Sequence, residues 1–293
     1  MAIDNTLKIR ILDAIKTDRE NFTSDGIHTK KIGINKGIYS QLKKGVIDRI
    51  LSDGEWIRIG RTLNVQLSAK PAWIVVETPV FDYISSQLEY CQRQSSTGLF
   101  CDDCDIGKTE TAKHYASTHR NVVLVDCSQV KSKQKFIRFI ASQFGVDSTG
   151  KLVDVIADMV YYVKTLEKPL IIFDEAGDLE YNAFLEIKAL YNHLERMCGF
   201  YMIGAEGLKA KFNRAIHNKK VGYAEIFSRF GSKHQAMKFK DLKEKTHFRI
   251  YQAELIIKAN APQDKYAQVL KDSDLSLRRI HDLCDELNQM PAA

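Results

Sequence analysis

The chain has 293 residues, of which 44% are hydrophobic and 27% charged, and its formal net charge is +6. This length allows two or three domains with cores of their own. No apolar run is long enough to cross a membrane, and the N-terminus carries acids and no small-residue cleavage site. These features argue against a membrane-spanning or secreted protein and predict a cytoplasmic one, with its six cysteines as reduced thiols.

The first seventy residues predict a small helical domain. Apolar residues at helical spacing predict a helix from Leu7 to about Glu20. Gly33 should end a second, short helix, and Asn35 is a suitable N-cap for a third helix that ends at Gly45. Between residues 27 and 70, nine basic residues stand against three acids. This local excess of positive charge favours a polyanionic partner.

Residues 28–45, HTKKIGINKGIYSQLKKG, resemble the helix-turn-helix of Cro-like repressors. In this pattern Tyr39 and Leu42 would pack inward. The resemblance implies that the third helix enters the major groove of DNA. The expected contacts to base edges come from Lys36, Ser40 and Gln41, and those to phosphates from Lys30, Lys43 and Lys44. The alternative is a helical hairpin that serves protein contacts.

A connecting segment separates this domain from the rest. Residues 58–67, RIGRTLNVQL, predict a short strand or extended arm that closes the first domain. Pro71 and Pro79 mark a linker, and apolar spacing then predicts a helix from Phe81 to Arg93. We therefore expect a first domain at residues 1–70, and a linker with an approach helix at residues 71–97.

Strands and helices alternate between residues 98 and 240, which predicts an α/β domain with a parallel sheet and helices on both faces. The expected strands are residues 98–101, 121–126, 169–174, 200–206 and 234–239. The expected helices between them are residues 108–119, 131–144, 152–166 and 182–196. Three further helices, at residues 241–259, 262–271 and 275–289, would form a helical lid at residues 241–293.

Residues 101–109, CDDCDIGKT, lie between an expected strand and an expected helix, which is the context of a phosphate-binding P-loop. Backbone N–H groups of the loop and of the helix N-terminus would surround a polyphosphate. Lys108 would reach the phosphates, and the Thr109 hydroxyl would hold Mg²⁺. The expected nucleotide-binding residues are Asp102, Asp103, Cys104, Asp105, Ile106, Gly107, Lys108 and Thr109.

This loop departs from the usual pattern G-x-x-x-x-G-K-[ST]. Asp102 stands where the first glycine belongs, and Asp103 and Asp105 add two more carboxylates close to the expected phosphates. Like charges there would weaken anion binding. The Cys101-x-x-Cys104 pair also suggests a zinc or redox site, but no second Cys or His pair completes four ligands.

Residues 169–175, PLIIFDE, form an apolar strand that ends in two acids, the Walker B pattern. Asp174 would hold Mg²⁺ beside Thr109, and Glu175 would act as the general base on a water molecule. ATP and Mg²⁺ are therefore the predicted cofactors, and ATP hydrolysis is the predicted reaction. After the next strand, Ala205 and Glu206 occupy the place where such proteins often carry an Asn or Thr. For residues 169–175, the alternative to a Walker B strand is an ordinary buried strand with acidic residues at its end.

Residues 225–230, EIFSRF, resemble the SRF box of AAA+ ATPases. This resemblance implies that Arg229 is offered to the γ-phosphate bound by a neighbouring subunit and stabilises the transition state there. At the start of the last lid helix, Arg278 falls where AAA+ proteins carry a second sensor arginine, with Arg279 as the alternative. The simpler interpretation of Arg229 is a surface ion pair with a glutamate. That of Arg278 and Arg279 is a pair of solvated helix arginines. The implied fold is an AAA+ P-loop domain with a helical lid, preceded by an all-α domain.

The order of these parts, with Trp73 and Glu77-Thr-Pro in the linker, resembles the Mu transposition protein B family of target-selection ATPases. The family implies a homo-oligomer, either a ring or a helical filament, that assembles on double-stranded DNA with ATP inside a bacterial host cell. It also implies delivery of target DNA to a transposase, with slow hydrolysis stimulated by DNA or by that partner. Basic residues of the core would then face DNA too: Lys131, Lys133, Lys135, Lys209, Lys211, Arg214, Lys219 and Lys220. For each of these, the alternative is a solvated surface charge.

Two other classes of protein share these features. A helicase loader would have the same core, with an appended domain that binds a helicase. A non-hydrolysing DNA-binding regulator would have a degenerate phosphate loop, which the loop aspartates favour. Sustained ATP turnover with and without duplex DNA would eliminate the regulator.

Overall fold

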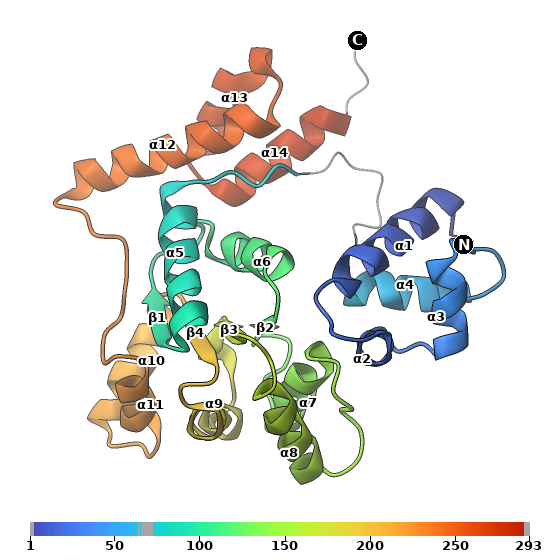
Figure 1. The fold of residues 1–293 in the computed structure, drawn as a ribbon. Coiled ribbons are helices and arrows are strands. Elements are labelled where there is room, and N and C mark those ends of the chain that lie inside the picture. Colours follow the sequence, from blue (N-terminus) through green and yellow to red (C-terminus); the bar gives the residue numbers. More distant parts are fainter. Residues whose placement is uncertain (1–2, 64, 66–72, 290–293) are drawn as a thin grey trace.

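The structure, a computed structural model, describes residues 3–63, 65 and 73–289. Three groups of elements are visible in Figure 1: four N-terminal helices at one side, a central sheet with its helices, and a C-terminal helical lid above the sheet. Each group has its own cluster of buried apolar side chains, and the central group has two, one on each face of the sheet.

The N-terminal group buries its apolar side chains around Trp56, Ile11 and Leu42. Gly33 follows the second helix with a left-handed φ of 66°, and the Asn35 side chain accepts the Ile38 N–H at 2.8 Å to begin the third. These two boundaries agree with the sequence interpretation. The four helices are α1 (Asn5–Arg19), α2 (Asp25–Ile32), α3 (Lys36–Lys43) and α4 (Asp53–Thr62).

The prediction of an extended arm at residues 58–67 is wrong for residues 58–62, which lie in α4. Ser52 and Glu55 form a capping box that begins this helix, and Trp56 and Ile59 then fall on its buried face. The side chain of Arg58 donates to the carbonyls of the α2 end instead of facing solvent. Residues 64 and 66–67 lie outside the described residues, as does the predicted domain boundary near residue 70.

The central sheet has four parallel strands in the order β1-β4-β3-β2. The expected fifth strand at residues 234–239 is reduced to one parallel bridge, between Gln235 and Phe100 of β1. The Gln235 N–H and C=O both bond to β1, but the next backbone N–H in line, at Met237, donates to the Asp102 side chain. The strands are β1 (Thr97–Cys101), β2 (Val122–Asp126), β3 (Leu170–Asp174) and β4 (Gly199–Gly204).

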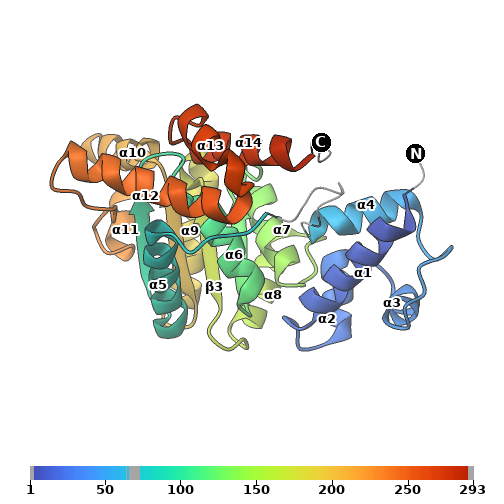
Figure 2. The same cartoon turned by 90° about the horizontal axis from the view of Figure 1, so that it is seen from above.

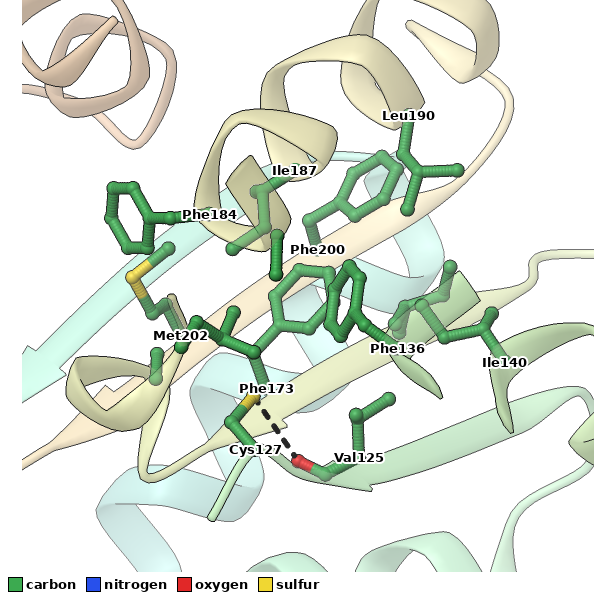
Figure 3. Close-up of a cluster of buried hydrophobic side chains, with 14 of the residues drawn as sticks. Val125, Cys127, Phe136, Ile140, Phe173, Phe184, Ile187, Leu190, Phe200 and Met202 are labelled. Carbon is green, nitrogen blue, oxygen red and sulfur yellow. Dashed lines mark hydrogen bonds between the residues drawn. The ribbon is translucent and has the colours of Figure 1, made fainter. Parts of the chain in front are cut away.

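Helices cover both faces of the sheet, as the alternating pattern predicted (Figures 1 and 2). One face packs against α5 (Pro79–Gln94) and α6 (Lys108–Thr118). The other carries the larger core, in which Phe173, Phe200 and Met202 of the strands meet Phe136 and Phe184 of the helices (Figure 3). The helices on this face are α7 (Lys133–Gln143), α8 (Leu152–Val163), α9 (Tyr181–Leu194), α10 (Glu206–His217) and α11 (Tyr223–Arg229). The short 3₁₀ turn η1 (Ala176–Asp178) follows β3.

The lid consists of α12 (Leu242–Asn260), the 3₁₀ turn η2 (Gln263–Lys265), α13 (Tyr266–Asp272) and α14 (Leu277–Gln289). Ile257 and Ile280 lie at its centre, and Trp73 and Val76 of the linker pack against this core. The linker therefore connects the lid to the start of α5. In the part of the chain that the structure describes, no helix is long and apolar enough to span a membrane.

The N-terminal helices contact the central domain through α2 and α7. The closest approach is at Gly145, just after α7, where an added Cβ would lie 2.4 Å from Cγ2 of Ile27. Gly145 also has a φ of 75°, so both the space and the backbone require glycine there.

A candidate nucleotide site between the P-loop and the lid

A cavity of about 620 Å³ lies between the P-loop and the lid, a volume within the usual range of ligand pockets. The loop and α6 form its floor, the linker forms one wall, and α14 covers it. Glu175 also lines it, at the end of β3. The remaining lining residues that matter here are Cys104, Asp105, Gly107, Lys108 and Thr109 from the loop and α6, Trp73 and Thr78 from the linker, and Leu277, Arg278 and His281 from the lid.

The floor of the cavity presents a helix N-terminus without a side-chain cap. Gly107 precedes α6 with a φ of 96°, and no side chain accepts the first N–H groups of that helix. Such groups, with the helix dipole, favour an anion. The Lys108 side chain is almost fully buried, and its ammonium donates to the carbonyls of Asp102, at 3.0 Å, and of Asp103.

Thr109 and Asp174 meet beside Lys108. The Thr109 hydroxyl donates to Oδ2 of Asp174 at 2.8 Å, which links the start of α6 to the end of β3. Burial raises the pKa of Asp174, against the bonds from Thr109 and from the Glu175 N–H. Partial desolvation and the neighbouring Asp174 also raise the pKa of Glu175, although this residue remains exposed to solvent. This hydroxyl and carboxylate oxygen set is the kind that Mg²⁺ prefers.

All three loop aspartates bind protein groups, whereas the sequence indicated only repulsion of phosphate. The buried Asp102 accepts the Met237 N–H at 2.7 Å, and Asp103 pairs with Lys245 of α12 at 2.5 Å. Asp105 contacts the start of α14. Cys104 and Ile106 complete the loop, the first exposed and the second buried. Sequence reasoning missed Lys245 and Ser276 because their partners lie more than 140 residues earlier, and no local pattern marks such a pair.

The two predicted catalytic arginines lie in different places. Arg278 lines the cavity, with its Nε 3.9 Å from Oδ1 of Asp105 and its side chain 80% exposed. The exposed Arg279 does not line it. Arg229 lies at the end of α11 and is not part of this cavity; its guanidinium donates to Oδ1 of Asn192 at 3.0 Å and to the Glu225 carbonyl. Within one chain, the structure does not bring Arg229 to Lys108.

The place after β4 where such proteins often carry an Asn or Thr holds the start of a helix. Ala205 precedes α10, and Glu206 begins that helix with an ion pair of 3.2 Å to Lys209. The site also offers no zinc centre: Cys101 is buried in β1, with its pKa raised to about 12 by burial, while Cys104 is exposed. Among the described residues, no group of three His, Cys, Asp or Glu side chains could hold a metal ion.

The residues predicted to contact DNA differ in solvent exposure and in whether they form ion pairs within the chain. Lys36, Ser40 and Gln41 are exposed on α3, and Lys30 and Lys44 are exposed nearby. Lys43 forms an ion pair with Asp25 at 2.9 Å. In the central domain, Lys131 pairs with Asp178 at 3.1 Å and Lys133 with Glu186 at 2.5 Å. Lys211 is half buried on the carbonyls of Gly177 and Leu179, and burial lowers its pKa.

Comparison with known proteins agrees with the candidate nucleotide site described above. Residues 97–212, from β1 into α10, match the family described as the AAA domain. The chain is also 26% identical over 160 residues to the Mu-like prophage FluMu DNA transposition protein B of Haemophilus influenzae. That match covers 54% of this chain and 54% of the relative, so it spans about half the length of each.

These matches confirm two expectations drawn from the sequence. The parallel sheet with helices on both faces is the α/β P-loop fold of AAA+ proteins, and the AAA match covers the P-loop and the Walker B strand. The resemblance to the Mu family rests on the prophage relative. The chain is therefore similar, over about half of its length, to a transposition protein B of a Mu-like prophage, and its residues 97–212 match an AAA domain.

Proposed function

We propose that this chain is a DNA-binding AAA+ ATPase that assembles on double-stranded DNA with ATP and delivers target DNA to a transposase. The observation that carries the ATPase part is the bond of 2.8 Å between Thr109 and Asp174, with Lys108 and Glu175 at the same cavity. The transposase and target-DNA part rests on the similarity to a transposition protein B.

The residues at the cavity fit a magnesium–nucleotide complex. Lys108 and the uncapped N-terminus of α6 would bind phosphate oxygens. Thr109 and Asp174 would hold Mg²⁺, which neutralises phosphate charge when bound. Glu175 is exposed beside them, and its raised pKa makes it a better proton acceptor than an ordinary carboxylate. Arg278 would stabilise phosphate charge from the lid side.

The DNA-binding part rests on the N-terminal domain. The exposed face of α3 offers Lys36, Ser40 and Gln41, with Lys30 and Lys44 at its sides. The core lysines support DNA binding less, because Lys131 and Lys133 are already ion-paired. Assembly into an oligomer is part of the proposal, since Arg229 would then act on the site of a neighbouring copy.

Phosphate release measured with and without duplex DNA tests the ATPase. We expect slow release that DNA increases. Lys108→Ala should abolish it, and Thr109→Ala should lower it by about a hundredfold or more, because loss of transition-state charge stabilisation costs roughly 3 kcal/mol. Thr109→Ser keeps the hydroxyl and serves as the matched control. A wild-type rate of phosphate release no higher than that of Lys108→Ala would contradict the proposed ATPase activity.

The three loop aspartates favour one alternative, a DNA-binding regulator that binds nucleotide without hydrolysing it. The same assay separates the two functions when nucleotide binding is measured in parallel by calorimetry. Binding without turnover, both with and without DNA and transposase, would favour the regulator. Sustained turnover would exclude it.

A further inference from the structure

Asp105 of the P-loop joins the loop to the start of the last lid helix. Its Oδ2 accepts the Ser276 hydroxyl at 2.6 Å, and its Oδ1 accepts the Arg278 N–H at 3.1 Å. The two residues that donate these bonds lie 171 and 173 positions further along the chain. The contact therefore connects two parts of the fold that the sequence separates widely.

Asp105 acts as an N-cap that comes from outside the helix. The first N–H groups of any helix lack partners within it, and Asp105 accepts one of them at α14. Ser276, directly before the helix, accepts the Arg279 N–H at 3.3 Å and donates its own hydroxyl to Asp105. A carboxylate at this end also interacts favourably with the helix dipole. The start of α14 is thus held on the loop by a charge and two hydrogen bonds.

The loop backbone suits this role. Asp105 has a φ of 61°, a left-handed conformation that Asp tolerates and glycine adopts freely. Replacing Asp105 with glycine would therefore remove the carboxylate without straining the loop, whereas alanine would add strain.

The same carboxylate lines the nucleotide cavity together with Lys108 and Arg278. A polyphosphate bound there would repel Asp105 and attract the Arg278 guanidinium, whose Nε lies 3.9 Å from Asp105 and whose side chain is 80% exposed. Phosphate and Asp105 therefore compete for the same positive groups.

We propose that Asp105 is a latch that holds the lid helix α14 on the P-loop and positions Arg278, and that nucleotide phosphate releases this latch by competing with it. The contact between loop and lid is a feature of the chain itself. The competition rests on the proposed nucleotide binding.

Hydrogen exchange of the nucleotide-free protein tests the latch directly. In Asp105→Gly, the amides of the first turn of α14 should exchange about five- to tenfold faster, as expected for the loss of a cap worth roughly 1 kcal/mol. Ser276→Ala should have a similar effect from the lid side. Asp147→Asn, which changes an exposed turn carboxylate remote from the cavity, is the matched control. Exchange in Asp105→Gly within twofold of wild type would overturn the latch.

Calorimetry with Mg²⁺ and a non-hydrolysable ATP analogue tests the competition. Asp105→Asn keeps an acceptor oxygen and removes the charge, so the analogue should bind about tenfold more tightly. Asp105→Gly should also bind the analogue more tightly than wild type, because it too lacks the competing charge. Unchanged affinity in both variants would overturn the competition. Faster exchange together with no binding to any variant or to wild type would overturn the proposed function and support the latch as a structural contact.

Discussion

At the scale of single residues, the site contains a carboxylate that opposes folding. Asp174 is 5% exposed, and burial raises its pKa. A carboxyl group with a raised pKa in the folded state binds more protons folded than unfolded, so stability falls as pH rises through that pKa. At pH 7 the ionised Asp174 therefore lowers the free energy of unfolding. A buried carboxylate that lowers the stability of the fold is typical of a functional site.

We therefore predict that Asp174→Asn raises the melting temperature at pH 7, by about 2–4 °C for a chain of this size, while it weakens Mg²⁺-dependent nucleotide binding. The gain should shrink as the pH falls through the raised pKa of Asp174, because the carboxyl group of the wild type then becomes protonated. Calorimetric melting at several pH values measures this. Asp158→Asn, on the exposed face of α8, controls for the loss of one surface charge. A melting temperature of Asp174→Asn below wild type at pH 7 would show that the buried carboxylate is stabilising.

At the scale of elements, α3 of the N-terminal domain exposes both a basic and an amide side chain, Lys36 and Gln41. We predict that Lys36→Ala weakens duplex binding, because a cation expected at a base edge is lost together with its attraction to the neighbouring phosphates. The slope of log affinity against log salt should fall by no more than about 1. If Gln41 reads a base edge, Gln41→Ala should instead leave the salt slope unchanged and reduce any preference between sequences.

The matched control for α3 is Lys133→Ala, which removes an ion-paired lysine of the central domain. It should change duplex affinity less than Lys36→Ala does. Fluorescence anisotropy over a range of salt concentrations measures all three variants. Equal losses for Lys36→Ala and Lys133→Ala would indicate that α3 has no special place in DNA binding.

The elements also show what the sequence could predict. The strands of the central sheet and α6 were predictable because apolar runs and the Gly107-Lys108-Thr109 sequence are local signals. The buried face of α3 follows from the spacing of Tyr39 and Leu42. The start of α4 was missed, although Ser52 and Glu55 have the spacing of a capping box, because the β-branched and apolar residues within 58–67 suggested a strand. The contacts of the loop aspartates were not predictable, since lid and loop meet only in three dimensions.

At the scale of the whole molecule, Arg229 is the residue whose predicted role needs a second copy. It is half-buried at the end of α11, bonded to Asn192 and Glu225 and placed over the Tyr191 ring, and it does not line its own chain's cavity. A guanidinium held in place by these bonds could act on phosphates only if a second copy brings its own cavity next to α11. An assembly of this kind would combine one copy's Lys108 with another copy's Arg229.

If one copy supplies Lys108 and another supplies Arg229, two inactive variants should complement each other. Lys108→Ala and Arg229→Ala should each lose DNA-stimulated phosphate release, the second by about a thousandfold, as for other arginines supplied in trans. Mixing them before adding DNA should restore part of the activity, because some junctions then pair an intact Lys108 with an intact Arg229. Melting curves of Arg229→Ala and Arg229→Lys would show whether loss of the Asn192 bond destabilises the fold. If the mixture has no more activity than the separate variants while both still assemble on DNA, Arg229 does not act across a junction and only its bonds within the chain remain to explain its position.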